Sequence, residues 1–167
     1  MTDGQLYFDS SLFYKGIKPA INFGLSVSRI GNKAQWPGIR KLSKDFRLEY
    51  LQYQELLQMT RLRATGLSEE AQTRLKRGEI LTQLINQDKH KPIPLEGQMI
   101  YLFALIKGML NSLSSAGIKK FKDEVLPFVR ERSPGLINAM TSMHDFSGQH
   151  EEELKNILLD FFDQVMG

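Results

Sequence analysis

The sequence predicts a mainly α-helical protein, with a multi-helix C-terminal bundle and a short, largely non-helical N-terminal extension. Two observations predict this fold class. From about residue 32 onwards, apolar residues recur at steps of three and four, which is typical of helices with one buried face. Residues 1–31 lack that pattern and contain glycines and a proline, which are typical of turns. We therefore divide the chain into an extension, residues 1–31, and a bundle, residues 32–167.

Composition limits the classes of protein to consider. The 167 residues suffice for one domain with its own core. The absence of cysteine excludes disulfides, thiolate metal sites and cysteine nucleophiles. No run approaches the roughly 18 apolar residues that a membrane span requires. The net charge is +3, and Lys and Arg outnumber Asp and Glu by ten to five in residues 1–67. Such a mild excess is weak evidence for a nucleic-acid partner.

The extension begins with a strand-like segment over residues 5–14 that ends as a turn or a short helical piece. Its apolar cluster, Leu6 to Phe8, is too short to pair with itself, and we expect no partner strand nearby. An unpaired strand leaves backbone donors and acceptors without partners. We therefore expect residues 1–31 either to be loosely ordered or to pair with chain outside this sequence, and we interpret the sequence as truncated.

The helical pattern begins at Asn32, and the first helix is expected to end at Gly66. Pro37 suits its first turn, where the missing N–H has no role. Gly66 ends the helix, with Arg61 and Arg63 near the negative end of its dipole. Its buried face consists of residues at helical spacing, namely Ile39, Leu42, Phe46, Tyr50, Tyr53 and Leu57.

The next helix starts at Ser68, a capping hydroxyl followed by two glutamates that suit the positive end of the dipole. We expect it to run to about Arg77 and to be interrupted by Gly78. The buried face continues beyond with Ile80, Leu81, Leu84 and Ile85. Residues 87–94 contain two prolines and are expected to form a polar loop.

The second half predicts four helices. The segment over about 95–112 is apolar most of the way round, so we expect it to be the central helix of the bundle. Residues 116–132 form another, which Pro127 kinks or breaks. Pro134 opens a short helix to about Met143. The last helix buries Leu154, Ile157, Leu158, Phe161, Phe162 and Val165.

Few motifs predict catalysis or metal binding. The chain contains neither G-x-x-x-x-G-K-[ST] nor G-x-G-x-x-G, the two usual phosphate-binding loops. The spacing of His90, His144 and His150 matches no helical metal site, so we interpret them as surface residues. A hydrolase that uses His144, Asp145 and His150 therefore has no supporting spacing. The acidic run Glu151–Glu153 is interpreted as a helix start, because consecutive residues point in different directions.

A stand-alone helical module that binds nucleic acid is the alternative hypothesis. It rests on the basic residues of the first helix, namely Arg40, Lys41, Lys44 and Arg47. Asp45 and Glu49 interleave with them, and this mixed pattern favours a solvated face or an acidic protein partner. Binding to nucleic acid would weaken steeply with salt, because phosphate contacts release counterions.

The segment from Gly16 to Gly31 is punctuated by three glycines and a proline, and it contains one arginine, Arg29. Taken alone it is typical of a surface loop. Its sequence, however, closely resembles the α subunit of F-type ATP synthases. The matching residues are Asp3-Gly4-Gln5, Leu12-Phe13, Gly16-Ile17-Lys18-Pro19-Ala20-Ile21-Asn22 and Gly24-Leu25-Ser26-Val27-Ser28-Arg29-Ile30-Gly31. The resemblance continues more thinly through Ala34-Gln35, Leu51-Gln52-Tyr53, Arg77-Gly78 and Pro92 to the C-terminus.

The resemblance implies roles for particular residues. Arg29 matches the arginine finger that reaches the catalytic site of the neighbouring β subunit and steadies the transferring phosphoryl group. Lys18, Pro19 and Gln87 match positions that line the nucleotide pocket of α itself, which binds nucleotide without turning it over. The family commonly has arginine in place of Lys18 and a second glutamine in place of Lys89.

The resemblance also implies an assembly. Residues 1–31 would be the end of a nucleotide-binding domain, and residues 32–167 the C-terminal helical domain. The implied partners are the β subunits of the hexamer and the central rotor stalk, which we expect the basic helix and its following loop to meet. ATP or ADP with Mg would bind the full-length subunit, whereas we expect no cofactor, nucleic acid or ATP hydrolysis for these 167 residues alone. Contact with the membrane would be indirect, on the cytoplasmic face of a bacterial inner membrane or the mitochondrial matrix side.

Overall fold

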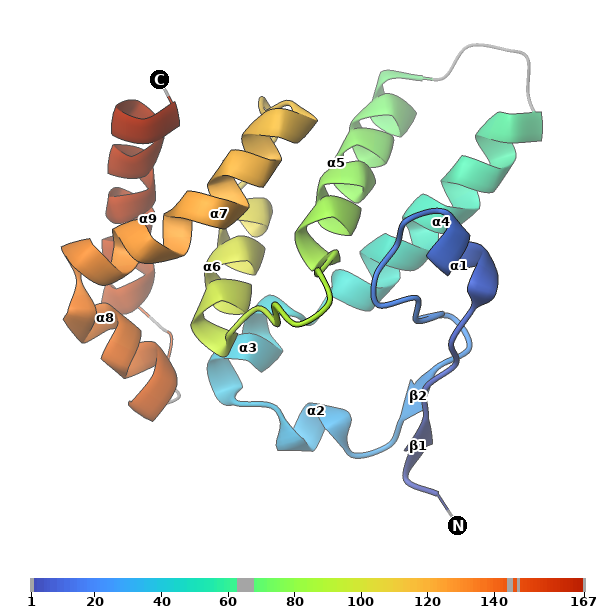
Figure 1. Cartoon of the computed structure of the whole chain (residues 1–167), viewed down its shortest axis with the longest axis horizontal. Helices are drawn as coiled ribbons and strands as arrows, with labels where there is room; N and C mark the ends of the chain where they lie inside the picture. The colour runs from blue at the N-terminus through green and yellow to red at the C-terminus, as the bar shows by residue number, and fades with distance from the viewer. Residues whose placement is uncertain (1, 63–67, 144–145, 147, 167) are drawn as a thin grey trace. The chain divides into compact units, whose positions relative to one another are not determined.

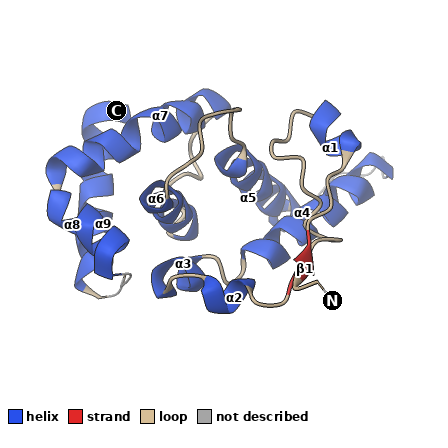
Figure 2. Ribbon diagram, turned by 60° about the horizontal axis from the view of Figure 1, so that its bottom comes forward, coloured by secondary structure: helices blue, strands red, loops and turns tan. Residues whose placement is uncertain are grey.

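The computed structural model describes residues 2–62, 68–143, 146 and 148–166. The fold is mainly α-helical, a helical bundle with a short N-terminal extension, as the sequence predicts (Figure 1, Figure 2). The chain forms two compact units, of which the first comprises Met1–Ala34 and Lys44–Pro92, and the second Gln35–Ser43 and Ile93–Gly167. The predicted domain boundary after residue 31 stays a prediction.

The first unit contains β1 (Gly4–Gln5), α1 (Ser10–Tyr14), β2 (Val27–Ser28), α2 (Gly31–Ala34), α4 (Phe46–Leu62) and α5 (Glu69–Ile85). β1 pairs with β2 in antiparallel fashion, with Gly4 opposite Ser28, and an isolated bridge joins Phe8 to Ile21. The prediction that the N-terminal strand has no partner nearby is therefore wrong. Gly4 permits the pairing, since a Cβ there would lie 2.5 Å from the Val27 carbonyl oxygen.

The helix predicted over residues 32–66 is wrong as a single element. The segment forms α2, α3 (Pro37–Leu42) and α4. Ser43 ends α3 by donating its backbone N–H to the Ile39 carbonyl at 2.8 Å, and the Glu49 N–H bonds the Asp45 carbonyl at 2.9 Å as α4 begins. The apolar spacing continues across this break because α3 and α4 each bury one face, so periodicity alone did not reveal it.

Helix starts follow the predicted signals. Pro37 occupies the first turn of α3. The Ser68 hydroxyl caps α5 by accepting the Ala71 backbone N–H at 3.3 Å. The predicted helix end at Gly66, and the side chains of the arginines placed near it, lie outside the described residues.

α5 runs without a break through Gly78, so the predicted interruption is wrong. Gly78 is buried and faces Tyr53 on α4, where an added Cβ would lie 2.2 Å from the ring. The glycine therefore lets the two helices approach closely and does not end the helix. Three of the apolar residues predicted beyond it are buried, namely Ile80, Leu81 and Leu84, whereas Ile85 is half-buried.

Aromatic contacts join the extension to α4. The Phe23 ring centroid lies 5.7 Å from that of Phe46 and 5.1 Å from that of Tyr50, both edge to face. Tyr50 is in turn 6.5 Å from Tyr53, centroid to centroid. Aromatic pairs of this kind contribute about 0.5–1.5 kcal/mol each beyond their burial. The extension is thus anchored to α4 by the packing of aromatic side chains.

The second unit contains α3, α6 (Leu95–Ile106), α7 (Ser115–Arg132), α8 (Pro134–Asn138), the π-helical turn η1 (Ala139–Met143), α9 (Gln149–Phe161) and the π-helical turn η2 (Phe162–Met166). α6 ends at Ile106, earlier than the predicted residue 112, and a turn follows in which Gly108 has φ +71°. Pro127 lies inside an unbroken α7, so the predicted break is absent. The short helix from Pro134 is confirmed.

The core of the second unit is built around α6, which α3, α7 and α9 contact. Met99, Ile100, Phe103 and Ala104 on α6 are at most 1% exposed, which confirms its central position. The Tyr101 hydroxyl donates to the Lys122 carbonyl of α7 at 2.7 Å. α7 also contacts α9 through two fully buried aromatic side chains, Phe121 on α7 and Phe161 on α9.

We expect Gly78→Ala to destabilise the protein. The added Cβ would overlap the near end of the Tyr53 side chain, so the helices must separate. Overpacking costs about 1–3 kcal/mol, which exceeds the gain of about 0.5–1 kcal/mol from alanine in a helix. Denaturant unfolding measures the change. The control is Gly135→Ala in α8, where an added Cβ meets nothing within 4 Å, and equal stability of the two variants would contradict this packing.

We expect stability to fall between pH 10 and 12 through Tyr101. Burial, and secondarily the charge of Asp123, raise the pKa of Tyr101 from 10.0 to about 12. The folded state therefore holds this proton more tightly than the unfolded state, and the resulting stability is lost as pH rises above 10. Relative to Tyr101→Phe, the parent should lose up to about 1.4 kcal/mol per pH unit. Tyr14→Phe at an exposed position is the control, and a pH slope unchanged by Tyr101→Phe would exclude this origin.

Candidate functional site

The turn from Gly16 to Pro19 lies against the C-terminal end of α5 in the first unit. Asp9 is the N-cap of the preceding helix, α1, and its carboxylate accepts the Ser11 backbone N–H at 2.8 Å. Hydrogen bonds from the Ser11 side chain and then from its backbone N–H lower the pKa of Asp9. The chain turns after α1 at Gly16, whose φ of +79° favours glycine. A cis peptide bond joins Lys18 to Pro19. The turn thereby presents Lys18 and Pro19 on the surface.

Three hydrogen bonds hold this turn on the end of α5. The Asn86 side-chain amide donates from Nδ2 to the Gly16 carbonyl at 3.0 Å, and its Oδ1 accepts the Lys18 N–H at 3.0 Å. The Gln87 N–H donates to the Lys18 carbonyl at 2.8 Å. The structure therefore brings Gln87 to Lys18 and Pro19, which lie far before it in the sequence. We call these three residues the Lys18–Gln87 cluster.

The cluster combines one cation with one amide. The Lys18 side chain is exposed, and its Nζ lies 5.9 Å from the centre of the Phe13 ring. In the described part of the chain, no carboxylate forms a salt bridge with Lys18. Gln87 is half-buried, and its backbone N–H bonds the Lys18 carbonyl. A phosphate or another anion can bind an exposed ammonium group, and a glutamine amide can donate or accept hydrogen bonds.

Sequence reasoning missed Asn86. It lies directly before the predicted polar loop, residues 87–94, and no role was predicted for it. In the structure it is the C-cap of α5, with φ −68° and ψ 125°, and its side chain makes the contacts that bring the cluster together. The one available signal was the preference of asparagine for helix ends, where its short amide reaches nearby backbone groups.

Arg29 directly follows β2. Its backbone N–H donates to the Asp3 carbonyl at 3.0 Å, which fixes the main chain, while the side chain is exposed. Among the described residues, the guanidinium makes no hydrogen bond or ion pair. The neighbouring apolar side chains Leu25, Val27 and Ile30 are all at least half exposed. Arg29 is thus a charged group on an apolar surface, and no contact joins it to the Lys18–Gln87 cluster.

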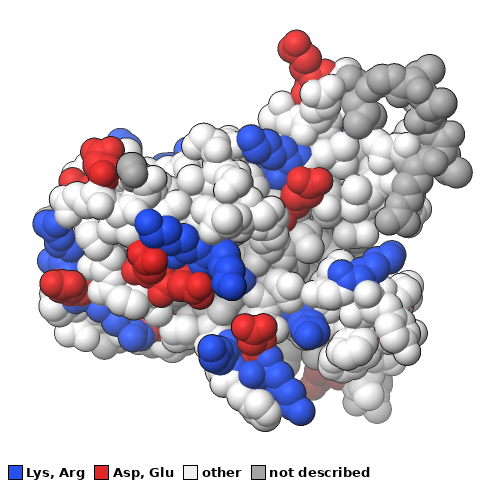
Figure 3. All heavy atoms as spheres, turned by 45° about the horizontal axis from the view of Figure 1, so that its top comes forward, with Lys and Arg blue, Asp and Glu red and all other residues white. Residues whose placement is uncertain are grey.

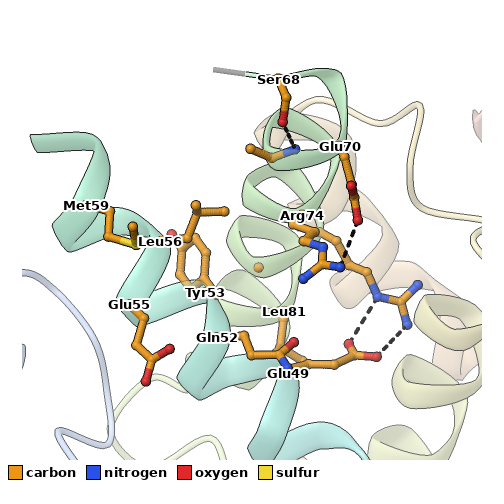
Figure 4. A pocket seen from close by; sticks show the side chains of 13 residues that line it. Glu49, Gln52, Tyr53, Glu55, Leu56, Met59, Ser68, Glu70, Arg74 and Leu81 are labelled. Carbon is orange, nitrogen blue, oxygen red and sulfur yellow. Dashed lines mark hydrogen bonds and ion pairs between the residues drawn. The ribbon is translucent and has the colours of Figure 1, made fainter. Parts of the chain in front are cut away.

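A groove of about 470 Å³ lies between α4 and α5 (Figure 4). Arg77 forms a bidentate pair with Glu49 at 3.0 and 3.1 Å, and Arg74 pairs with Glu70 at 2.8 Å. Both arginines are therefore paired with carboxylates, so the described residues of the groove lack the uncompensated positive charge that a phosphate site requires. Its apolar lining includes Tyr53, Leu56, Met59 and Leu81.

The predicted basic helix is divided between α3 and α4, which belong to different compact units. Arg40 donates to the Gln35 carbonyl at 2.9 Å, and Lys41 pairs with Glu151. Lysine and arginine lie among acidic residues over the face shown in Figure 3. The expectation of four basic side chains on one helix is therefore wrong. The loop expected to follow that helix lies outside the described residues.

The histidines do not assemble a catalytic group among the described residues. His90 lies exposed in the turn after α5, and His150 is in the first turn of α9. His144 and Asp145 lie outside the described residues. No group of three His, Asp or Glu side chains in the described part of the chain is placed to hold a metal ion.

The run Glu151–Glu153 behaves as a helix start. Glu151 and Glu152 lie in the first turn of α9, where acids suit the dipole. Each of the three has a partner of its own: Glu151 pairs with Lys41, Glu152 lies 3.3 Å from Lys155, and Glu153 accepts from the Ser133 hydroxyl at 2.7 Å. The three side chains therefore diverge, as their consecutive positions predict.

Comparison with known protein families gives one match. The model of the ATP synthase alpha/beta chain, C terminal domain, matches residues 35–161. This range contains α3 to α9 and includes Gln87, whereas Lys18, Pro19 and Arg29 precede it. None of the described helices is long and apolar enough to cross a membrane.

Proposed function

Because residues 35–161 match its C-terminal domain, this chain belongs to the ATP synthase alpha/beta family, and we propose that it is part of an α subunit of a rotary ATP synthase. Family membership implies assembly within the ATP synthase complex. The choice of α rather than β rests on the resemblance of the segment from Gly16 to Gly31, which precedes the matched range.

The observation that carries this proposal is the Lys18–Gln87 cluster. Lys18 and Pro19 come from the extension and Gln87 from the helical region, yet the resemblance assigns all three to one nucleotide pocket. The Gln87 N–H bonds the Lys18 carbonyl at 2.8 Å, and this contact supports the proposal that both residues line one pocket. A sequence resemblance alone does not produce this contact, which therefore supports the proposal independently.

The proposed pocket binds ATP or ADP with Mg and does not turn it over. Lys18 would place its ammonium group toward the phosphates, and Gln87 would donate or accept through its amide. The phosphate loop of the family is not among these residues, so the cluster would supply one wall of the pocket. Mg would neutralise part of the phosphate charge there, and Lys18, Pro19 and Gln87 would bind and orient the nucleotide.

Arg29 is proposed to act on the neighbouring β subunit. A guanidinium is always charged and presents a planar set of donors that matches phosphate oxygens. In the described residues it has no partner within its own chain, as a donated residue requires. At the catalytic site of β it would meet the charge that develops on the transferring phosphoryl group. ATP synthesis or hydrolysis there is coupled to ion transport through the central rotor stalk and a membrane sector.

We expect Arg29→Ala in the assembled complex to lower ATP hydrolysis by about 10³-fold or more, as for other arginine fingers. Lys15→Ala, which removes an exposed cation from the same extension, is the matched control and should leave turnover unchanged. Steady-state hydrolysis by purified complexes measures both. Near-normal turnover of the Arg29 variant would refute the proposed role in trans.

We expect Lys18→Ala to weaken nucleotide binding at the α subunit's own pocket about 10-fold or more, because a hydrogen bond to a charged group contributes about 1.5–3 kcal/mol. Lys18→Arg should tighten binding, because the guanidinium can bind phosphate in bidentate fashion. Equilibrium binding of labelled ADP to the assembled complex measures each affinity, with Lys15→Ala as control. Equal affinity in the parent and Lys18→Ala would remove Lys18 from the pocket.

A further inference from the structure

We propose that Asn86 is a positioning residue that holds the nucleotide-lining turn, residues 16–19, on the end of α5. The inference deepens the proposed function and rests on it for the identity of the ligand. Asn86 would not touch the nucleotide. It would act through the backbone of Lys18 and thereby fix the position from which the Lys18 side chain extends, relative to Gln87.

The geometry uses both ends of one carboxamide. Nδ2 donates to the Gly16 carbonyl and Oδ1 accepts the Lys18 N–H, each at 3.0 Å. A flipped amide would place donor against donor and acceptor against acceptor, so only one orientation satisfies both backbone groups. The side chain therefore imitates a segment of backbone, and it fixes the turn at two residues on either side of Ile17.

The position of Asn86 at the helix end connects this clamp to α5. Its backbone N–H bonds the Thr82 carbonyl at 3.2 Å, so the residue still belongs to the last turn of the helix. The next residue, Gln87, bonds the Lys18 carbonyl. Residues 86 and 87 thus hold both backbone polar groups of Lys18, and a displacement of the α5 end moves Lys18 and Gln87 together.

Several common substitutions remove one or both of the groups that this amide uses. Alanine lacks both groups, lysine has donors only, and an ionised aspartate has acceptors only. Aspartate is therefore the informative variant, because it keeps an acceptor for the Lys18 N–H and loses the donor to Gly16. The two bonds of the clamp can be separated by comparing Asn86→Ala with Asn86→Asp.

The first experiment measures amide hydrogen exchange in the 167-residue chain. Asn86→Ala should speed exchange of the Lys18 amide about 10-fold or more, because its acceptor is gone. Asn86→Asp should keep that amide closer to the parent rate. Asn156→Ala, at an exposed asparagine on α9, is the control and should change nothing at Lys18. An unchanged Lys18 amide in Asn86→Ala overturns the clamp.

The second experiment measures binding of labelled ADP to the α subunit's own pocket in the assembled complex. We expect Asn86→Ala to weaken binding several-fold while kcat for ATP hydrolysis stays within about twofold, since the catalytic site does not contain Asn86. The ADP affinity of Asn86→Asp should lie between those of the parent and Asn86→Ala. Asn86→Asp is the variant to measure if Asn86→Ala does not assemble. A merely structural role would lower assembly and kcat together, without this selective loss of affinity.

The two proposals fail in different ways. If Asn86→Ala binds ADP as tightly as the parent while Lys18→Ala binds it more weakly, the positioning role is overturned and the proposed nucleotide pocket stands. Parent affinity in Lys18→Ala as well overturns the proposed pocket, and the positioning role with it, even where the exchange data show the clamp. Weaker binding in both variants supports both proposals.

Discussion

The close approach of α5 to α4 at Gly78 is the constraint on which the first unit depends. Only a residue without a side chain leaves room for the Tyr53 ring at this point. Tyr53 also contacts Tyr50, which packs on Phe23 of the extension. The spacing of the two helices therefore affects where the aromatic cluster forms. Asn86 and Gln87 stand at the C-terminal end of α5, where they hold the turn from Gly16 to Pro19.

Much of the fold was predictable because helix faces and helix starts are local properties. The capping hydroxyl of Ser68 and the proline at position 37 act within one turn of chain, and both behave as predicted. The errors concern features that depend on distant residues. Gly78 suggested a helix break because its neighbour, Tyr53, is not visible in the local sequence. The partner of β1 likewise lies more than twenty residues away, and the break at Ser43 separates two helices that continue one apolar pattern.

The candidate site shows the same difference between features that are visible in the local sequence and features that depend on distant residues. The resemblance assigned Lys18 and Gln87 to one pocket, and the structure places their backbones in contact. No pattern in the sequence indicated Asn86, because its role depends on two backbone groups about 70 residues earlier. Arg29 stays a prediction, since its proposed partner belongs to another subunit. Its guanidinium is exposed and has no partner among the described residues, as a group that binds a neighbouring subunit requires.

The central claim is that this chain binds one nucleotide beside Lys18 and acts on a second through Arg29. An experimental structure of the assembled complex with a transition-state analogue of phosphoryl transfer tests it most directly. We expect the Arg29 guanidinium within about 3 Å of analogue oxygens on the neighbouring subunit. We also expect a separate nucleotide beside Lys18 and Gln87. An Arg29 side chain that faces solvent while the analogue occupies the neighbouring site would refute the proposed role of Arg29.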